Sequence, residues 1–188
     1  MNGPNFLTVV RFFLAVGFII FVQQPGLWPV VTAAVFFTLA ALTDYFDGHL
    51  AKKHNLVTDF GKIMDPIADK FLILSAFFIF MKMNLIPGWM FTAVAAREIL
   101  VTVSRLLAMK KGRVIAAERE GKLKTVFQMT TVFLALGFLI LNKIPSGPAW
   151  LHQQNFLFWE FCLIQVVMLA AVGLTLFSGA KYFWNNRF

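Results

Sequence analysis

The sequence has little cysteine and little charge. Its single cysteine, Cys162, lies in an apolar run, which excludes an intramolecular disulfide and leaves the thiol as a packing residue. Charged residues make up 14% of the 188 residues, whereas a soluble domain has about a quarter. Hydrophobic residues make up 59%. A fold of this size cannot hide so much apolar surface, so we expect the bilayer to be its solvent.

Acidic residues are scarcer than basic ones. The chain has 9 Asp plus Glu against 17 Lys plus Arg, a formal charge of +8. In a membrane chain, basic residues mark cytoplasmic loops and contacts with anionic lipid or phosphate. We therefore expect membrane lipids, and no nucleic acid, as partners. A P-loop, a Cys-x-x-Cys pair and a Ser–His–Asp pattern are all absent, and the first apolar run is expected to be a retained helix.

Long apolar segments predict an all-α integral membrane protein with six transmembrane helices in a single domain, residues 1–188. The segments are Phe6–Val22, Val30–Phe46, Pro66–Met81, Ile86–Met109, Thr125–Leu141 and Phe156–Phe177. Several are shorter than the ~20 residues that cross a hydrocarbon core, so we expect short helices beside a water-filled cavity. Gly17, Gly137 and Gly173 are expected to allow close helix packing.

The basic residues alternate along the connections. Nearly all of the basic residues in the connections lie in Asp47–Asp65, in Lys110–Lys124 and in the C-terminal tail, whereas the other connections are almost uncharged. The positive-inside rule then predicts that both termini are cytoplasmic. Tryptophans are expected at the two membrane interfaces, four at the outer one and one at the inner: Trp28, Trp89, Trp150, Trp159 and Trp184.

Four aspartates lie at the predicted cytoplasmic ends of two helices. Asp44 and Asp47 are three apart at the end of the second apolar segment, and Asp65 and Asp69 are four apart at the start of the third, so each pair shares a helix face. Pro66 follows Asp65, a pattern that predicts a helix beginning there with Asp65 as its cap. The alternative interpretation is that these are solvated loop acids and a simple cap.

Carboxylates that converge near lipid repel one another, and a divalent cation removes this conflict. Ligation by oxygen alone suits magnesium, manganese or calcium. We expect Asp44, Asp47, Asp65 and Asp69 to bind metal, and Gly48 and Gly61, which flank the connection, to let the backbone approach a ligand.

At these residues the chain resembles the CDP-alcohol phosphotransferase family, whose pattern is D-x-x-D-G-x-x-A-R followed by G-x-x-x-D-x-x-x-D. The matching residues are Asp44, Asp47, Gly48, Ala51, Lys52, Gly61, Asp65 and Asp69. Lys52 stands where the family usually has arginine, which keeps the charge and loses the bidentate fork for phosphate.

Secondary motifs resemble the bacterial phosphatidylglycerophosphate synthase group within this family. They are Pro4-Asn5-Phe6-Leu7-Thr8 with Arg11, Ala96-Arg97-Glu98-Ile99 with Thr102 and Arg105, and Gly121-Lys122-Leu123-Lys124-Thr125 with Gln128. The resemblance implies a homodimeric, multi-pass enzyme of the bacterial inner membrane, with its active site facing the cytoplasm. CDP-diacylglycerol would donate a phosphatidyl group to glycerol 3-phosphate.

The resemblance also implies roles for single residues. Two Mg²⁺ or Mn²⁺ ions would bridge the CDP pyrophosphate, and Asp69 would be both ligand and base. The CDP-diacylglycerol contacts would be Asn5, Thr8, Gly48, Ala51, Lys52, Thr58 and Gly61. Asn5 as a plain helix cap is the alternative.

A dianionic acceptor needs cations. Basic residues at the cytoplasmic level are expected to bind its phosphate: Arg105, Lys122, Lys124 and Arg113. Ordinary positive-inside charge is the alternative. Arg97 lies deeper and is expected to pair with Glu98 or with a neighbouring helix, and its role stays open. Rival functions are the same chemistry with inositol phosphate, serine or phosphatidylglycerol as acceptor, a small cation transporter, and a metal-binding structural protein.

Overall fold

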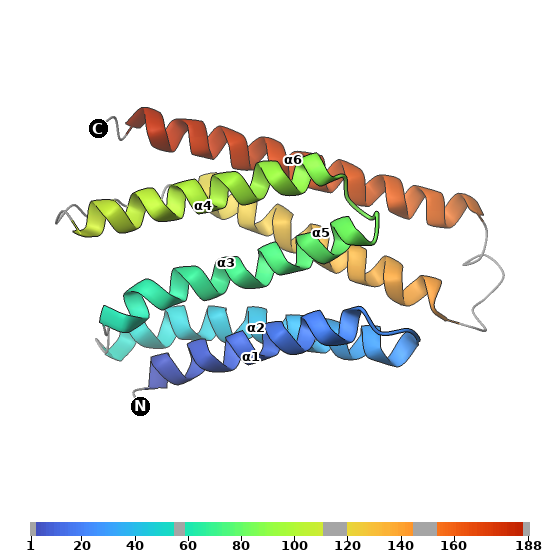
Figure 1. Cartoon of the computed structure of the whole chain (residues 1–188), viewed down its shortest axis with the longest axis horizontal. Helices are drawn as coiled ribbons and strands as arrows, with labels where there is room; N and C mark the ends of the chain where they lie inside the picture. The colour runs from blue at the N-terminus through green and yellow to red at the C-terminus, as the bar shows by residue number, and fades with distance from the viewer. Residues whose placement is uncertain (1–2, 55–58, 111–119, 145–153, 186–188) are drawn as a thin grey trace. The chain divides into compact units, whose positions relative to one another are not determined.

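A computed structural model describes the backbone of residues 3–54, 59–110, 120–144 and 154–185. Within these ranges it also describes the side chains, except those of residues 3–8, 44–54, 59–66, 69, 109–110, 120–122 and 154–155. This described part of the chain is all helical (Figure 1). The helices are α1 (Gly3–Val22), α2 (Leu27–His54), α3 (Asp59–Lys82), α4 (Gly88–Lys110), α5 (Glu120–Asn142) and α6 (Gln154–Asn185). The prediction of six helices is confirmed.

The helices are longer than the apolar segments that predicted them. They have between 20 and 32 residues, and at about 1.5 Å per residue even the shortest is about 30 Å long. The expectation of short helices was wrong because polar residues at the helix ends continue the helical backbone. Two helical stretches, Leu123–Asn142 and Phe156–Asn185, are long and apolar enough to cross a membrane, and two shorter apolar ones are Val9–Val22 and Leu27–Thr43.

The chain forms two compact units. The first comprises residues 1–79 and 139–146, and the second residues 80–138 and 147–188.

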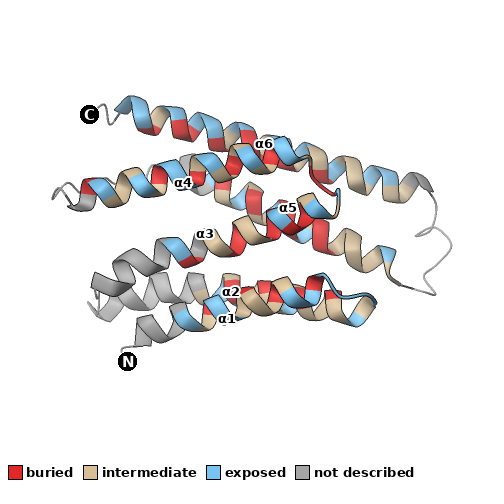
Figure 2. Ribbon diagram, viewed as in Figure 1, coloured by how far each residue is buried: buried red, intermediate tan, exposed pale blue. Residues whose placement is uncertain are grey.

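In the first unit, α1 packs along α2. The buried residues of α1 recur every three or four positions, at Arg11, Ala15, Phe18 and Val22, which places them on one helix face. The opposing face of α2 is built in the same way, from Val30, Ala33, Phe37 and Ala40. Figure 2 shows these buried positions recurring along the helices.

Glycine allows the closest approach of these two helices. A Cβ on Gly17 would lie 2.6 Å from the ring of Phe36, a distance that real side chains do not tolerate. Phe18 and Phe37 pack beside this contact with ring centroids 5.5 Å apart. The prediction that Gly17 allows close packing is therefore confirmed.

In the second unit, α4 packs on α6. The buried face of α6 includes Ile164, Met168, Ala171 and Thr175. Successive helices of this unit are antiparallel, so the end of α4, the start of α5 and the end of α6 lie together (Figure 1).

Two predicted packing glycines of this unit differ. Gly137 of α5 faces Glu160, whose Oε1 would lie 3.9 Å from an added Cβ. Gly173 has no described atom within 4 Å of such a Cβ. The prediction for Gly173 was wrong because the residue lies on the exposed side of α6.

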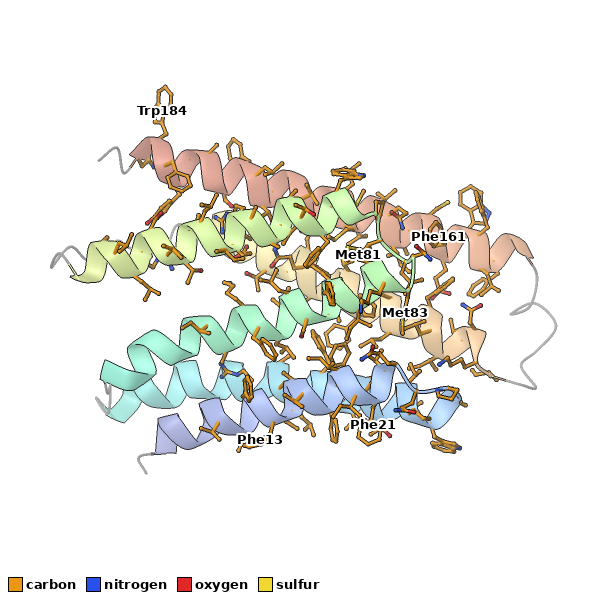
Figure 3. All side chains as sticks on the ribbon, viewed as in Figure 1. Phe13, Phe21, Met81, Met83, Phe161 and Trp184 are labelled. Atoms are coloured by element: carbon orange, nitrogen blue, oxygen red, sulfur yellow. The ribbon has the colours of Figure 1, made fainter. Side chains whose placement is uncertain are left out.

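Large apolar side chains cover the outer faces of the helices. Phe13 is 69% exposed on α1, and Phe177 is 61% exposed on α6. Four tryptophans are exposed near helix ends: Trp28, Trp89, Trp159 and Trp184. Trp184 projects away from α6 in Figure 3. Trp150 lies outside the described residues. These exposed apolar faces fit a lipid environment better than water.

Candidate active site

The first aspartate pair lies inside α2. Asp44 and Asp47 precede the last residue of this helix, His54, by ten and seven positions. The expectation that the helix ends at this pair was wrong, because the polar stretch after Phe46 stays helical. Counted from Asp44, the motif residues are at positions 0, 3, 4, 7 and 8, a spacing that places them on one face of α2.

The second pair lies inside α3. This helix begins at Asp59, so Asp65 and Asp69 follow its start by six and ten positions. The prediction that Asp65 caps the helix and that Pro66 opens it was wrong. The helix continues through Pro66, at the cost of the one backbone hydrogen bond for which proline lacks the donor. Gly61, Asp65 and Asp69 are four apart in turn and share a face.

The two pairs occupy matching levels. Only four residues separate His54 from Asp59, so the end of α2 and the start of α3 lie within a short span of each other. Asp47 and Asp65 are both about 10 Å from these ends, and Asp44 and Asp69 both about 15 Å, at about 1.5 Å per residue. The interpretation of all four as loop acids was therefore wrong, because they lie on helices.

The donor set at this level fits a hard divalent cation. Four carboxylates from two successive helices supply oxygen ligands only, which Mg²⁺ and Mn²⁺ favour. The side chains of these four residues lie outside those that the structure describes. Where side chains are described, no three His, Cys, Asp or Glu residues come together.

The predicted CDP-diacylglycerol residues lie partly within the described backbone. Asn5 and Thr8 belong to α1, Gly48, Ala51 and Lys52 to α2, and Gly61 to α3. Their side chains are outside the described set, and Thr58 is outside the described residues altogether. Gly48 and Gly61 have helical backbone and lie on either side of the connection between α2 and α3.

Within the second unit, α4, α5 and α6 bury a polar cluster around Glu98. Glu98 is 2% exposed. Its Oε1 accepts a hydrogen bond from Lys124 Nζ of α5, with which it forms an ion pair. Gln128 Nε2 lies 3.4 Å from the same oxygen and 3.3 Å from Thr175 Oγ1 of α6. Glu98 Oε1 thus links α4 to α5, and Gln128 extends the link to α6.

Arg97 is held from two sides. Its Nη1 lies 3.4 Å from Glu98 Oε1, and its Nη2 donates to Ser178 Oγ of α6 at 2.9 Å. A Cβ on Gly179 would lie 2.9 Å from Arg97 Cγ. Only glycine at this position leaves room for the arginine stem.

Arg105 adds a further cation. It lies near enough to Arg97 for their charges to repel. The Nε atoms of Arg97 and Arg105 are buried, and neither has a hydrogen-bond acceptor among the described residues. Among the described side chains, three cations and one carboxylate leave an excess of two positive charges in this cluster. A buried excess of this kind is costly unless an anion compensates it.

The structure describes some of the predicted acceptor residues fully, one by its backbone only and one not at all. Arg105 and Lys124 lie in the cluster, the backbone of Lys122 belongs to α5, and Arg113 is outside the described residues. The expectation that Arg97 pairs with Glu98 or with a neighbouring helix is confirmed, since Arg97 contacts both Glu98 and Ser178 of α6. Sequence reasoning assigned no role to Gln128, although it lies in a quoted motif. It missed Thr175 and Ser178, although a polar pair three apart in an apolar helix is a detectable signal.

A hollow of about 450 Å³ lies elsewhere in the second unit, at the turn between α3 and α4. Its lining includes Gln165 together with Met81 and Phe161, the last two of which are labelled in Figure 3. None of the predicted site residues lines it, and its walls are mainly apolar. It has no group suited to phosphate chemistry.

Comparison with protein-family models matches residues 1–177 to CDP-alcohol phosphatidyltransferase. Since this match covers nearly the whole chain, the chain belongs to the CDP-alcohol phosphatidyltransferase family, and the resemblance seen in the aspartate motif is confirmed.

Several bacterial relatives are similar to this chain over nearly all of its length. A protein of Bacillus subtilis (strain 168) named CDP-diacylglycerol–glycerol-3-phosphate 3-phosphatidyltransferase is 35% identical over 98% of this chain and 95% of its own length. One of the same name from Rickettsia typhi is 35% identical over 97% of this chain and 95% of its own. A probable phosphatidylglycerophosphate synthase of Mycobacterium tuberculosis (strain CDC 1551 / Oshkosh) is 37% identical over 96% and 79%.

Proposed function

We propose that this chain transfers the phosphatidyl group of CDP-diacylglycerol to sn-glycerol 3-phosphate, releasing CMP and forming phosphatidylglycerophosphate. The observation that carries this proposal is the match to relatives with that activity in their names, over nearly the full length of both chains. The matched levels of the two aspartate pairs on α2 and α3 support the same reaction class.

In this proposal, the donor binds near the end of α2 and the start of α3. Asp44, Asp47, Asp65 and Asp69 hold two Mg²⁺ or Mn²⁺ ions. When bound, these ions supply charge neutralisation for the pyrophosphate and the departing CMP. The CDP group lies against the motif faces of α2 and α3, with Lys52 as a point charge for phosphate. Asn5, Thr8, Gly48, Ala51, Thr58 and Gly61 complete the proposed donor contacts.

Asp69 is the proposed base. It accepts the proton from the 1-hydroxyl of glycerol 3-phosphate, whose oxygen then attacks the lipid-bearing phosphorus while CMP departs. A carboxylate of ordinary pKa, about 3.9, is a weak base. Its contribution therefore depends on holding the hydroxyl in line with the phosphorus.

The acceptor phosphate is assigned to the basic residues of the second unit. Arg105, Lys122, Lys124 and Arg113 form the proposed set, and the geometry adds Arg97. The excess of two positive charges around Glu98 matches the charge of a phosphate dianion. Arginine N–H groups without an acceptor suit its oxygens.

This charge balance separates the rival functions. Serine has no phosphate and would leave the excess uncompensated, whereas inositol phosphate would satisfy it as well as glycerol 3-phosphate does. A cation transporter would not gather three cations around one carboxylate, because they repel its cargo. The cluster therefore favours a phosphorylated acceptor.

The proposed setting is a bacterial inner membrane crossed six times, with both termini and the active site on the cytoplasmic side. The alternating basic connections and the exposed apolar helix faces support it. A homodimer is proposed from the family likeness alone.

A panel of acceptors tests the reaction. Purified protein in detergent would receive CDP-diacylglycerol, Mg²⁺ and one acceptor at a time, and CMP release and the lipid product would be measured. Release is expected with glycerol 3-phosphate and not with serine. Release with inositol phosphate or phosphatidylglycerol, and none with glycerol 3-phosphate, would assign the chain to another acceptor. No release with any acceptor would refute the enzyme proposal.

A further inference from the structure

The buried polar cluster of α4, α5 and α6 contains a carboxylate, although a negative charge weakens the binding of an anion such as phosphate. Glu98 lies among Lys124, Arg97 and Gln128, and its negative charge opposes the binding of a phosphate. It either neutralises surplus charge or holds the cations in place. The two roles predict opposite effects when its charge is removed.

The contacts of Arg97 favour the positioning role. Ser178 Oγ donates its own hydrogen to the Thr175 carbonyl at 3.1 Å, so its lone pairs are free to accept from Arg97 Nη2 at 2.9 Å. The direction of this bond is therefore fixed. Glu98 holds the other terminal nitrogen of the same guanidinium.

The stem of Arg97 is fixed as well. It passes over Gly179, where an added Cβ would lie 2.9 Å from Cγ and 3.2 Å from Nε. The guanidinium is thus held by two buried residues, Glu98 of the same helix (2% exposed) and Ser178 of α6 (3% exposed), and the stem passes over α6. Arg97 Nε keeps an N–H group with no described acceptor.

We propose that Glu98, Ser178 and Gly179 are positioning residues, which hold Arg97 in one conformation to bind the acceptor phosphate. The proposal rests on the acceptor site described above. An arginine that is already ordered loses less conformational freedom when the phosphate binds, so affinity rises without a new contact.

Glu98→Gln separates the two roles. The substitution keeps the side chain's size and makes the net charge of the cluster more positive by one unit. If Glu98 only neutralises charge, the KM for glycerol 3-phosphate falls. If Glu98 positions Arg97 and Lys124, that KM rises, by about fivefold or more, the scale of one lost charge-assisted hydrogen bond. The KM for CDP-diacylglycerol stays unchanged.

Two further variants leave the charge unaltered, which covers the case in which Glu98→Gln does not fold. Ser178→Ala removes one acceptor and is expected to raise the acceptor KM about threefold to tenfold. Gly179→Ala displaces the Arg97 stem and is expected to act in the same direction. Gly173→Ala is the matched control, on the same helix with no described atom within 4 Å of the new Cβ.

The proposal is overturned if Ser178→Ala and Gly179→Ala leave the acceptor KM at the control value, or if Glu98→Gln lowers it. A parallel rise in both KM values together with a lower melting temperature would show a merely structural role and would also overturn it. Arg97→Met tests the acceptor site itself. If Arg97→Met raises the acceptor KM while Ser178→Ala and Gly179→Ala do not, only the positioning proposal is refuted. If Arg97→Met leaves the acceptor KM unchanged, the acceptor site and the positioning proposal are both refuted.

Discussion

Removing Arg105 is expected to weaken acceptor binding without weakening the fold. Its Nε is buried without an acceptor among the described residues, and its charge repels that of Arg97. In the free protein, Arg105→Met relieves this repulsion, so its melting temperature should stay equal or rise. In the complex, the loss of one charged hydrogen bond to phosphate costs about 1.5–3 kcal/mol. At about 1.36 kcal/mol per tenfold, the acceptor KM should rise about tenfold to a hundredfold.

The assay is CMP release with varied glycerol 3-phosphate, alongside thermal unfolding in detergent. Lys143→Met is the charge-matched control, because Lys143 lies at the far end of α5 and its Nζ contacts the Gln24 carbonyl at 3.1 Å. It should leave the acceptor KM unchanged. An Arg105→Met protein with a normal acceptor KM and a lower melting temperature would refute the reasoning, since it would make Arg105 a structural residue.

Three further changes have expected outcomes. Gly17→Ala places a Cβ 2.6 Å from Phe36 and should lower the stability by about 1–3 kcal/mol. Gly173→Ala should raise the stability by about 0.5–1 kcal/mol, because glycine is a poor helix former. If both variants moved the melting temperature in the same direction, this reasoning would be contradicted. Glu160→Gln removes a carboxylate whose Oε2 is buried with no hydrogen-bond partner in the described part of the chain, so the melting temperature should rise with the acceptor KM unchanged, and a lower melting temperature would count against it. Chelation of divalent metal should stop CMP release, and added Mg²⁺ or Mn²⁺ should restore it; release that persists in chelator would contradict the proposed cofactor.

The sequence predicted the six helices because their apolar segments are long and separated by polar turns. It misjudged where helices end. Pro66 after Asp65 has the pattern of a helix start, yet α3 begins at Asp59. Local sequence preference does not determine where a helix begins or ends, because a proline removes only one helical hydrogen bond and the helix can continue past it.

The aspartates of the candidate site were predictable because their spacing is local and lies within two helices. The cluster around Glu98 was not, because it depends on contacts between residues distant in the sequence. Glu98 meets Lys124, and Arg97 meets Ser178, only after α4, α5 and α6 have packed. Polar residues in apolar helices signal a buried cluster but do not identify the partners within it.

Metal-dependent CMP release from CDP-diacylglycerol, compared between Asp69→Asn and Asp59→Asn, tests the central claim most directly. Both variants neutralise one aspartate of α3, but only Asp69 belongs to the motif face. The account predicts that the wild type and Asp59→Asn release CMP with glycerol 3-phosphate and Mg²⁺, and that Asp69→Asn keeps its melting temperature and releases none. Release from Asp69→Asn near the wild-type rate would contradict it.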